Sequence, residues 1–239
     1  SVRAIMQDKY GFLWIGTEEG LNRYDGIMIK SYSICPQAAG KYISSLYGTK
    51  KNIWIGTDEG IYIYAYATET FTYFDLTTPN NVRITSIVNH ILQDKDGNLW
   101  FSTNGQGLFR YNLSKNYLEQ YEFTSAFGIV ASTMADSDNQ IWALTNQGES
   151  GVYKLNKAEN KFEPFGLLYN AGNHHSQALA MLEDSEQTLW LGTWECGLQK
   201  IDKYTRQTTT YLHPTDGKGV THIHSLMEYA PHQLLIGSD

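Results

Sequence analysis

The sequence contains few of the features that would support a disulfide-rich, membrane-spanning or nucleic-acid-binding protein. It has two cysteines among 239 residues, Cys35 and Cys196, and their spacing matches no metal motif. No apolar run approaches the roughly 18 residues of a membrane-spanning helix. The net charge is −7 without a cluster of lysine and arginine. We therefore expect no nucleic-acid contact by this chain and no anionic membrane surface as a partner.

A sustained apolar period of 3.6 residues is also missing, so almost no helix is expected. Instead, runs of about four to eight residues rich in Ile, Val, Thr, Tyr and Trp alternate with Gly, Asn and Asp, as in strands joined by turns. One phrase recurs with a tryptophan at its centre, and successive tryptophans are 40 to 48 residues apart, a period typical of four-stranded propeller blades. The repeated positions are Trp14, Trp54, Trp100, Trp142 and Trp190, with Leu235 in the sixth place.

These repeats predict an all-β fold, a β-propeller of four-stranded antiparallel blades with five complete blades and the first half of a sixth. The partial propeller is expected to fill residues 1–239, with blades beginning near residues 1, 41, 87, 129, 177 and 222. Because the chain stops within a repeat, we expect it to be a segment of a longer protein. Each tryptophan is expected to be a buried wedge between blades, and the threonine three residues after it is expected to close the next corner with its hydroxyl. Large apolar residues stand eight positions before each wedge position and are expected to lie on one face of the first strand, at Met6, Leu46, Leu92, Met134, Leu182 and Met227.

Residues 2–26, VRAIMQDKYGFLWIGTEEGLNRYDG, resemble the regulator-propeller repeat of the extracytoplasmic sensor region of hybrid two-component histidine kinases from polysaccharide-degrading gut bacteria. Residues 88–112 and 178–202 fit the same pattern, whereas the fourth repeat departs from it with WALTNQGESGV. The resemblance implies a seven-bladed parent propeller and a periplasmic location. It also implies that a kinase and a membrane helix lie outside this sequence. Only those absent parts of the protein would contact the membrane. The expected partners are the remaining sensor domains of the same chain and a second copy in a homodimer.

Three functions are compatible with this fold, because propellers host many activities. The favoured one is a sensor that recognises an oligosaccharide from polysaccharide breakdown and signals to a membrane-spanning histidine kinase. A protein-interaction scaffold is an alternative, although the GH…WD punctuation of WD repeats is missing. A propeller lyase or hydrolase is a further alternative, because the repeat distantly resembles that of streptogramin lyases.

The motifs assign no catalytic residue, no metal site and no cofactor. The stretches DKDGNLW and DSDNQIW resemble the start of a calcium loop but lack its glutamate. The four histidines at 174, 175, 222 and 224 have no clear carboxylate partner, and adjacent histidines on a loop are poor joint ligands. We therefore expect no turnover of glycans by this chain.

The candidate ligand site rests on loops that break the repeat. The corner after the second strand is TEEG or TDEG in the first two repeats but TNGQG, TNQGESG and TWECG in the next three, and a long link, LLYNAGNHHS, precedes the fifth. In a propeller these corners and links open on one face, where amides and carboxylates can bind sugar hydroxyls and an extra tryptophan can stack on a pyranose ring. Packing on a neighbouring domain, or simple loop variation, is the alternative. The candidate residues are Asn104, Gln106, Asn146, Gln147, Glu149, Asn173, His174, His175, Trp194 and Glu195.

Overall fold

The computed structural model describes residues 1–34, 41–123, 128–145, 151–167, 177–212 and 222–238. These residues form strands joined by turns, and none of them is helical. None therefore forms an apolar helix of membrane-spanning length. The chain divides into two compact units, residues 1–122 (unit 1) and 123–239 (unit 2), which are described separately below.

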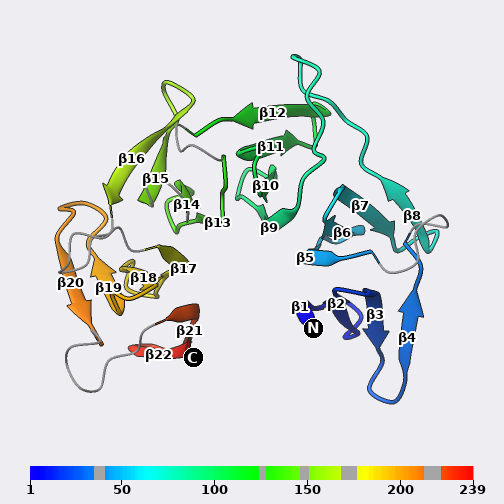
Figure 1. Cartoon of the computed structure of the whole chain (residues 1–239), viewed down its shortest axis with the longest axis horizontal. Helices are drawn as coiled ribbons and strands as arrows, with labels where there is room; N and C mark the ends of the chain where they lie inside the picture. The colour runs from blue at the N-terminus through cyan, green and yellow to red at the C-terminus, as the bar shows by residue number, and fades with distance from the viewer. Residues whose placement is uncertain (35–40, 124–127, 146–150, 168–176, 213–221, 239) are drawn as a thin grey trace. The chain divides into compact units, whose positions relative to one another are not determined.

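Unit 1 contains three antiparallel sheets, called blades 1 to 3, whose strands pair in chain order (Figure 1). Blade 1 consists of β1 (Val2–Gln7), β2 (Leu13–Thr17), β3 (Gly20–Tyr24) and β4 (Ile29–Tyr32). Blade 2 consists of β5 (Ile43–Gly48), β6 (Asn52–Thr57), β7 (Gly60–Ala65) and β8 (Thr70–Tyr73). Blade 3 consists of β9 (Val88–Gln93), β10 (Leu99–Thr103), β11 (Leu108–Asn112) and β12 (Tyr117–Tyr121).

Unit 2 contains two further four-stranded sheets and one two-stranded sheet, blades 4 to 6. Blade 4 consists of β13 (Ser132–Ala135), β14 (Ile141–Thr145), β15 (Gly151–Asn156) and β16 (Lys161–Leu167). Blade 5 consists of β17 (Ala178–Glu183), β18 (Leu189–Thr193), β19 (Leu198–Ile201) and β20 (Thr208–Tyr211), and blade 6 of β21 (Ile223–Ala230) and β22 (Gln233–Ser238). The predicted all-β fold of four-stranded antiparallel blades, with half of a sixth, is confirmed.

Apolar cores lie between consecutive blades of the same unit. Trp14 packs with Ile43 of blade 2, and Trp54 packs with Phe101 of blade 3. Trp142 belongs to a third core together with residues of blade 5. These three tryptophans and Trp100 are buried, as expected of wedges. Trp190, also predicted to be buried, is only partly buried.

An aspartate in the first turn of a blade holds the indole of the wedge tryptophan. In blade 1, Asp8 accepts a hydrogen bond from Trp14 Nε1 at 2.7 Å with one oxygen, and the backbone N–H of Phe12 at 3.0 Å with the other. The same aspartate–indole bond recurs at 2.7 to 2.9 Å in blades 3, 4 and 5. A carboxylate suits this position because it offers two oxygens, one for the turn and one for the ring. The three further pairs are Asp94–Trp100, Asp136–Trp142 and Asp184–Trp190.

Blade 2 has a shorter first turn, which shifts its register. In the other complete blades the aspartate N–H donates to a carbonyl four residues later, but Thr49, which takes its place, donates to Asn52, three residues later. As a result Tyr47 lies opposite Trp54. Leu46, eight residues before Trp54, is therefore one residue away from the place that Met6 and Leu92 take opposite their tryptophans.

The same substitution leaves the indole of blade 2 without a carboxylate. The single hydroxyl of Thr49 accepts from the Asn52 N–H at 3.0 Å and donates to the Asn52 carbonyl at 3.0 Å. Trp54 Nε1 is buried and has no hydrogen-bond partner among the described residues. The ring is held by aromatic contacts instead, with Phe74 at 5.4 Å and Phe101 at 5.7 Å between centroids. Blade 2 thus carries an unsatisfied polar group at a position where its neighbours have a bonded one.

We expect the substitution Thr49→Asp to stabilise the protein by about 1 kcal/mol, because a second oxygen would accept from the buried Trp54 N–H while the first keeps the turn. Urea unfolding followed by tryptophan fluorescence measures this change. Thr68→Asp, which adds the same charge on an exposed turn of blade 2, is the control. An equal or larger gain in the control would mean that charge, and not the indole bond, is responsible.

In unit 2, a buried lysine ties the first turn of blade 4 to blade 5. Lys203 Nζ lies 2.7 Å from Glu183 Oε1, 2.8 Å from Asp138 Oδ2 and 3.6 Å from Asp136 Oδ2, and its side chain is 3% exposed. Burial lowers the pKa of Lys203, but the hydrogen bonds to Asp138 and Glu183 and the charge of Asp136 outweigh it and raise the pKa above its usual value. Lys203 is therefore a charged group whose ion pairs join two blades.

Serine–glutamate contacts also join consecutive blades of unit 2. Ser137, in the first turn of blade 4, donates its backbone N–H and its hydroxyl to Glu183 of blade 5. Ser185, in the corresponding turn of blade 5, donates in the same way to Glu228 of blade 6, at 2.8 and 2.7 Å. The first turns of blades 4 and 5 are thus capped by a carboxylate from the blade that follows.

Candidate functional site

The corners between the second and third strands have a common closure. The threonine that ends the second strand donates its hydroxyl to the carbonyl of the glycine that ends the corner, for example from Thr103 to Gly107 and from Thr193 to Gly197, both at 2.6 Å. Corresponding bonds of 2.9 to 3.5 Å close the other corners. The predicted role of this threonine is confirmed. This hydrogen bond fixes the two ends of each corner relative to each other.

Trp194 is the first residue of the corner in blade 5 and lies outside the wedge positions. Its backbone N–H donates to the carbonyl of Gln177 at 2.8 Å, which anchors the corner to the start of its own blade. Its side chain is 40% exposed, whereas the wedge tryptophans of blades 1 to 4 are at most 3% exposed. An indole that is held at the backbone and partly exposed at its ring can serve as a stacking surface.

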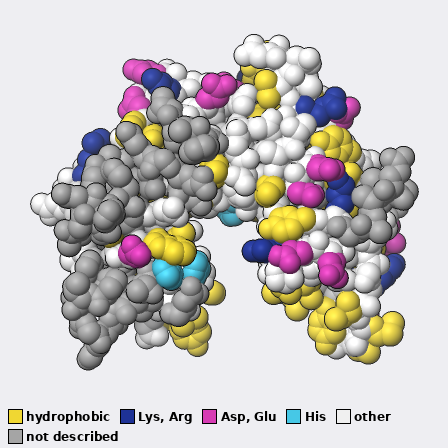
Figure 2. Space-filling model, in the orientation of Figure 1, with side chains coloured by type: hydrophobic (Ala, Val, Ile, Leu, Met, Phe, Trp, Pro, Cys, Tyr) yellow, Lys and Arg dark blue, Asp and Glu magenta, His cyan; other side chains and the backbone are white. Residues whose placement is uncertain are grey.

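Two histidines of blade 6 lie beside this indole. The rings of Trp194 and His222 have centroids 3.8 Å apart at an interplanar angle of 45°, and the two residues form an antiparallel bridge. His224 lies with its centroid 6.5 Å from that of Trp194 and 6.1 Å from that of His222. Figure 2 shows histidine side chains next to hydrophobic ones in the part of the molecule that Figure 1 labels β17 to β22. The three rings, Trp194, His222 and His224, are called the aromatic corner below.

Trp194 is among the site residues predicted from the sequence, whereas His222 and His224 are not, because their sequence context supports neither a metal site nor acid–base chemistry. A positional signal existed. In blades 3 and 5 the residue just before the first strand accepts a backbone hydrogen bond from a corner, and His222 holds that place before β21. Within the part of the chain that the structure describes, no group of three or more His, Cys, Asp or Glu side chains is arranged to hold a metal ion.

Glu195 follows Trp194 at the tip of the corner, where its side chain is exposed. Its φ of 68° lies in the left-handed region, which a non-glycine residue adopts in tight corners. Cys196 comes next and is buried. The corner therefore exposes an indole and a carboxylate and buries the side chain that follows them.

Gln106 occupies the place of Cys196 in the matching corner of blade 3, and its carboxamide is bound to the preceding link. Oε1 accepts from the backbone N–H groups of Thr85 and Ser86 at 2.8 and 3.0 Å, and Nε2 donates to the Arg83 carbonyl at 2.9 Å. These bonds give Gln106 a positioning role for the link between blades 2 and 3. Asn104 takes the position equivalent to Trp194, and its side chain is exposed.

The structure thus describes four of the ten candidate residues. Asn104 and Gln106 belong to unit 1, and Trp194 and Glu195 belong to unit 2. A single ligand rim that combines all ten stays a prediction. The remaining candidates, Asn146, Gln147, Glu149, Asn173, His174 and His175, lie outside the described residues.

Within each unit, antiparallel sheets pack on one another through buried tryptophans, an arrangement typical of a β-propeller. The family model of the two-component regulator propeller matches residues 1–19 and 81–105 of this chain. The resemblance found in the sequence is confirmed.

A relative among characterised proteins is histidine kinase P4 of Formosa agariphila, which is 28% identical over 146 residues. The alignment covers 58% of this chain and 10% of the kinase, so the chain corresponds to a small part of that protein.

Solved structures share the fold. The extracellular domain of BT3049 from B. thetaiotaomicron, assigned to a hybrid two component system, superposes with a TM-score of 0.79 at 24% identity. The match covers 99% of this chain and 32% of that one. Virginiamycin B lyase from Staphylococcus aureus superposes with a TM-score of 0.75 at 16% identity, covering 99% of this chain and 77% of the lyase. At these identities the likeness shows the propeller fold.

Proposed function

We propose that this chain is part of the ligand-sensing region of a two-component sensor, that it lies in the periplasm, and that it recognises an oligosaccharide. Binding would bias a membrane-spanning histidine kinase, carried by other parts of the parent protein, by favouring one arrangement of the sensor over another. The observation that supports ligand recognition is the exposed Trp194 of the aromatic corner, on a blade whose other tryptophan serves packing.

The comparisons support the sensing part of this proposal. The family model describes a two-component regulator, the relative is a histidine kinase, and one structure with the same fold is an extracellular domain of a hybrid two component system. The lyase shares the fold alone, and none of its residues is transferred to this chain. We accordingly assign no catalytic residue and no cofactor.

The chemistry of the aromatic corner suits a sugar. The apolar face of a pyranose ring packs against an indole, and imidazole N–H groups can donate to hydroxyls around its edge. His222 and His224 lie close enough to the indole to reach such hydroxyls. Glu195, exposed next to Trp194, adds an acceptor.

We expect Trp194→Ala to weaken oligosaccharide binding by about 1 to 3 kcal/mol, the size of an aromatic stacking contact measured for bases. Isothermal titration against a panel of neutral and acidic oligosaccharides measures this loss, and chromatography of the same mixtures tests for product release. Tyr229→Ala, which removes another exposed aromatic ring, on blade 6, is the control.

Unchanged affinity of the Trp194 variant, within about 0.5 kcal/mol, would contradict the assignment of the aromatic corner as the binding site. Release of products by the wild-type chain, abolished by a single substitution, would contradict the sensor reading and favour an enzyme. Thermal melting of both variants verifies that they remain folded.

A further inference from the structure

A groove recurs between consecutive blades, on the side of the turns that join the first to the second strand and the third to the fourth. It is described between blades 1 and 2, between blades 2 and 3, and between blades 4 and 5, with volumes of about 230, 460 and 360 Å³. Each groove is lined by the residue opposite the wedge tryptophan on the third strand and by a turn residue of the next blade with positive φ. The same fold therefore offers the same hollow three times with different side chains.

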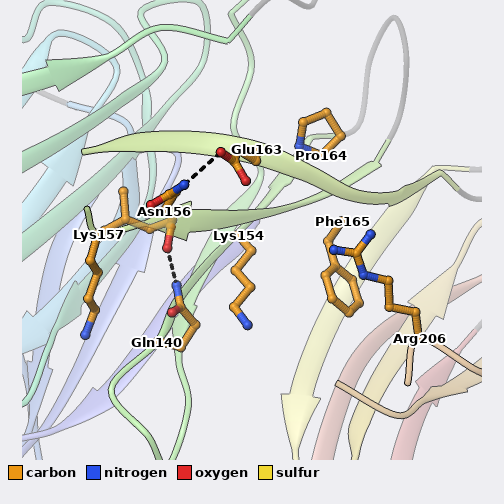
Figure 3. Close-up of a pocket in the computed structure, with 9 residues that line it drawn as sticks. Gln140, Lys154, Asn156, Lys157, Glu163, Pro164, Phe165 and Arg206 are labelled. Atoms are coloured by element: carbon orange, nitrogen blue, oxygen red, sulfur yellow. Dashed lines mark hydrogen bonds between the residues drawn. The ribbon is translucent and has the colours of Figure 1, made fainter. Parts of the chain in front are cut away.

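The charges at these two positions differ between the grooves. The first groove is lined by Arg23 and Glu69, and the second by Ile63 and Asn116. The third has Lys154 and Arg206, two cations at positions where the first groove has opposite charges. Lys157 adds a third cation to its lining, as Figure 3 shows. The groove between blades 4 and 5, defined by Gln140, Lys154, Lys157, Glu163, Phe165 and Arg206, is called the cationic groove below.

Aromatic rings hold two of these cations in place. Lys154 Nζ lies 5.2 Å from the centroid of the Trp142 ring, and the Arg206 guanidinium lies 5.0 Å from that of Phe165. The two rings contact each other edge to face, with centroids 4.7 Å apart. A cation–π contact fixes a cation without neutralising its charge. Both groups are thus positioned in the groove with their positive charge intact.

The carboxylates around the cationic groove are occupied by other partners. Glu163 accepts from Asn156 Nδ2 at 2.9 Å, and in Figure 3 the side chain of Lys154 extends away from it. Asp136, Asp138 and Glu183 of the neighbouring turns and strand are paired with Lys203. Among the described residues, Lys154, Lys157 and Arg206 form no ion pair with a carboxylate.

We propose that the cationic groove binds the acid group of an acidic glycan, a carboxylate or a sulfate ester. Lysine and arginine form charge-assisted hydrogen bonds with such groups, and a hollow of about 360 Å³ falls in the range of small-ligand sites. Gln140 Nε2 donates to the Leu155 carbonyl at 2.6 Å, and the oxygen of the same carboxamide can accept a hydrogen bond from a hydroxyl. That the ligand is a glycan rests on the proposed function. That it carries an acid group is inferred from the cations of the groove.

The cationic groove is separate from the aromatic corner. Gln140 precedes the first residue of β14, and Lys157 follows the last residue of β15, so both lie at the turn end of blade 4. Trp194 follows the last residue of β18, at the opposite end of the strands of blade 5. The two sites can therefore be tested by separate substitutions.

The test compares trigalacturonate, its methyl ester and a sulfated galactose trisaccharide by isothermal titration against the chain. Methyl esterification removes the charge and keeps the rings, so a preference for the free acid isolates the charged contact. We expect the acid to bind at least about tenfold more tightly than the ester, and Lys154→Gln and Arg206→Gln each to reduce this affinity by about tenfold to a hundredfold. The affinity should also fall as salt is raised. Lys161→Gln, which removes an exposed lysine of blade 4, is the control and should bind as the wild type does.

Equal binding of the acid and the ester would overturn the groove proposal. So would an acid preference that both Lys154→Gln and Arg206→Gln retain. If neutral sugars bind and Trp194→Ala abolishes that binding, the proposed function survives such a result. No binding of any oligosaccharide would overturn both. Poly-glutamate that binds as tightly as trigalacturonate, with the same dependence on Lys154 and Arg206, would overturn the glycan assignment in favour of an acidic peptide. The response to the sulfated sugar decides which acid group the groove prefers.

Discussion

Replacement of Lys203 by methionine is expected to lower the free energy of unfolding by about 3 kcal/mol. Removing one partner of a buried ion pair leaves the other charge uncompensated, a loss of about 3 to 5 kcal/mol. The lower end applies because Asp136 keeps its bond from Trp142 and Glu183 keeps its bonds from Ser137. Methionine preserves the length of the side chain, so the loss reflects charge more than volume.

Urea unfolding of the Lys203 variant, with Lys161→Met as the exposed control, measures this effect. The double variant with Glu183→Gln should lose less than the sum of the single losses, because the two side chains share one interaction. A loss below about 1 kcal/mol for the single variant would mean that the cluster is no stronger than a surface ion pair.

The second large effect is expected from Asp94→Asn in blade 3, at about 2 to 3 kcal/mol. Asp94 Oδ2 accepts from Trp100 Nε1 at 2.8 Å and from Asn98 Nδ2 at 2.9 Å, while Oδ1 accepts from the Asn98 N–H at 2.8 Å. An asparagine has the same shape but replaces one acceptor by an NH₂ donor, so a donor would face a buried donor. Neither group could then reach water, since both side chains are buried.

Thermal and urea unfolding of Asp94→Asn give the loss, with Asp96→Asn as the control in the same turn, where the side chain is exposed. The emission of the wedge indole should also change, because its N–H would lose its carboxylate. Equal stability of the two variants would show that the backbone bonds of the turn, and not the indole bond, account for the role of Asp94.

Much of the fold could be predicted because one side chain type marks each repeat. A tryptophan that must be buried between sheets tolerates few replacements, so its spacing identifies the blades directly. The register of blade 2 could not be read in the same way. Thr49 closes a shorter turn with the same kind of hydrogen bond, and only the backbone shows that the strand has moved by one residue.

The candidate site was harder to predict because side chains of similar chemistry serve different purposes. Gln106 has the amide expected of a sugar contact, yet in the structure that amide bonds the backbone of the preceding link. Its role depends on how closely the link passes the corner, which is set by packing between blades. Lys154 and Arg206 belong to different repeats, and their approach likewise depends on how blades 4 and 5 meet.

The serine–glutamate contacts between blades have a consequence for the order in which the chain folds. Ser137 bonds to Glu183, and Ser185 bonds to Glu228, so the first turns of blades 4 and 5 are capped only when the next blade is present. During synthesis from the N-terminus, a newly released blade would therefore remain incompletely bonded until its successor leaves the ribosome. Folding should then proceed from one blade to the next in chain order. The most recently synthesised blade should exchange its amide protons fastest.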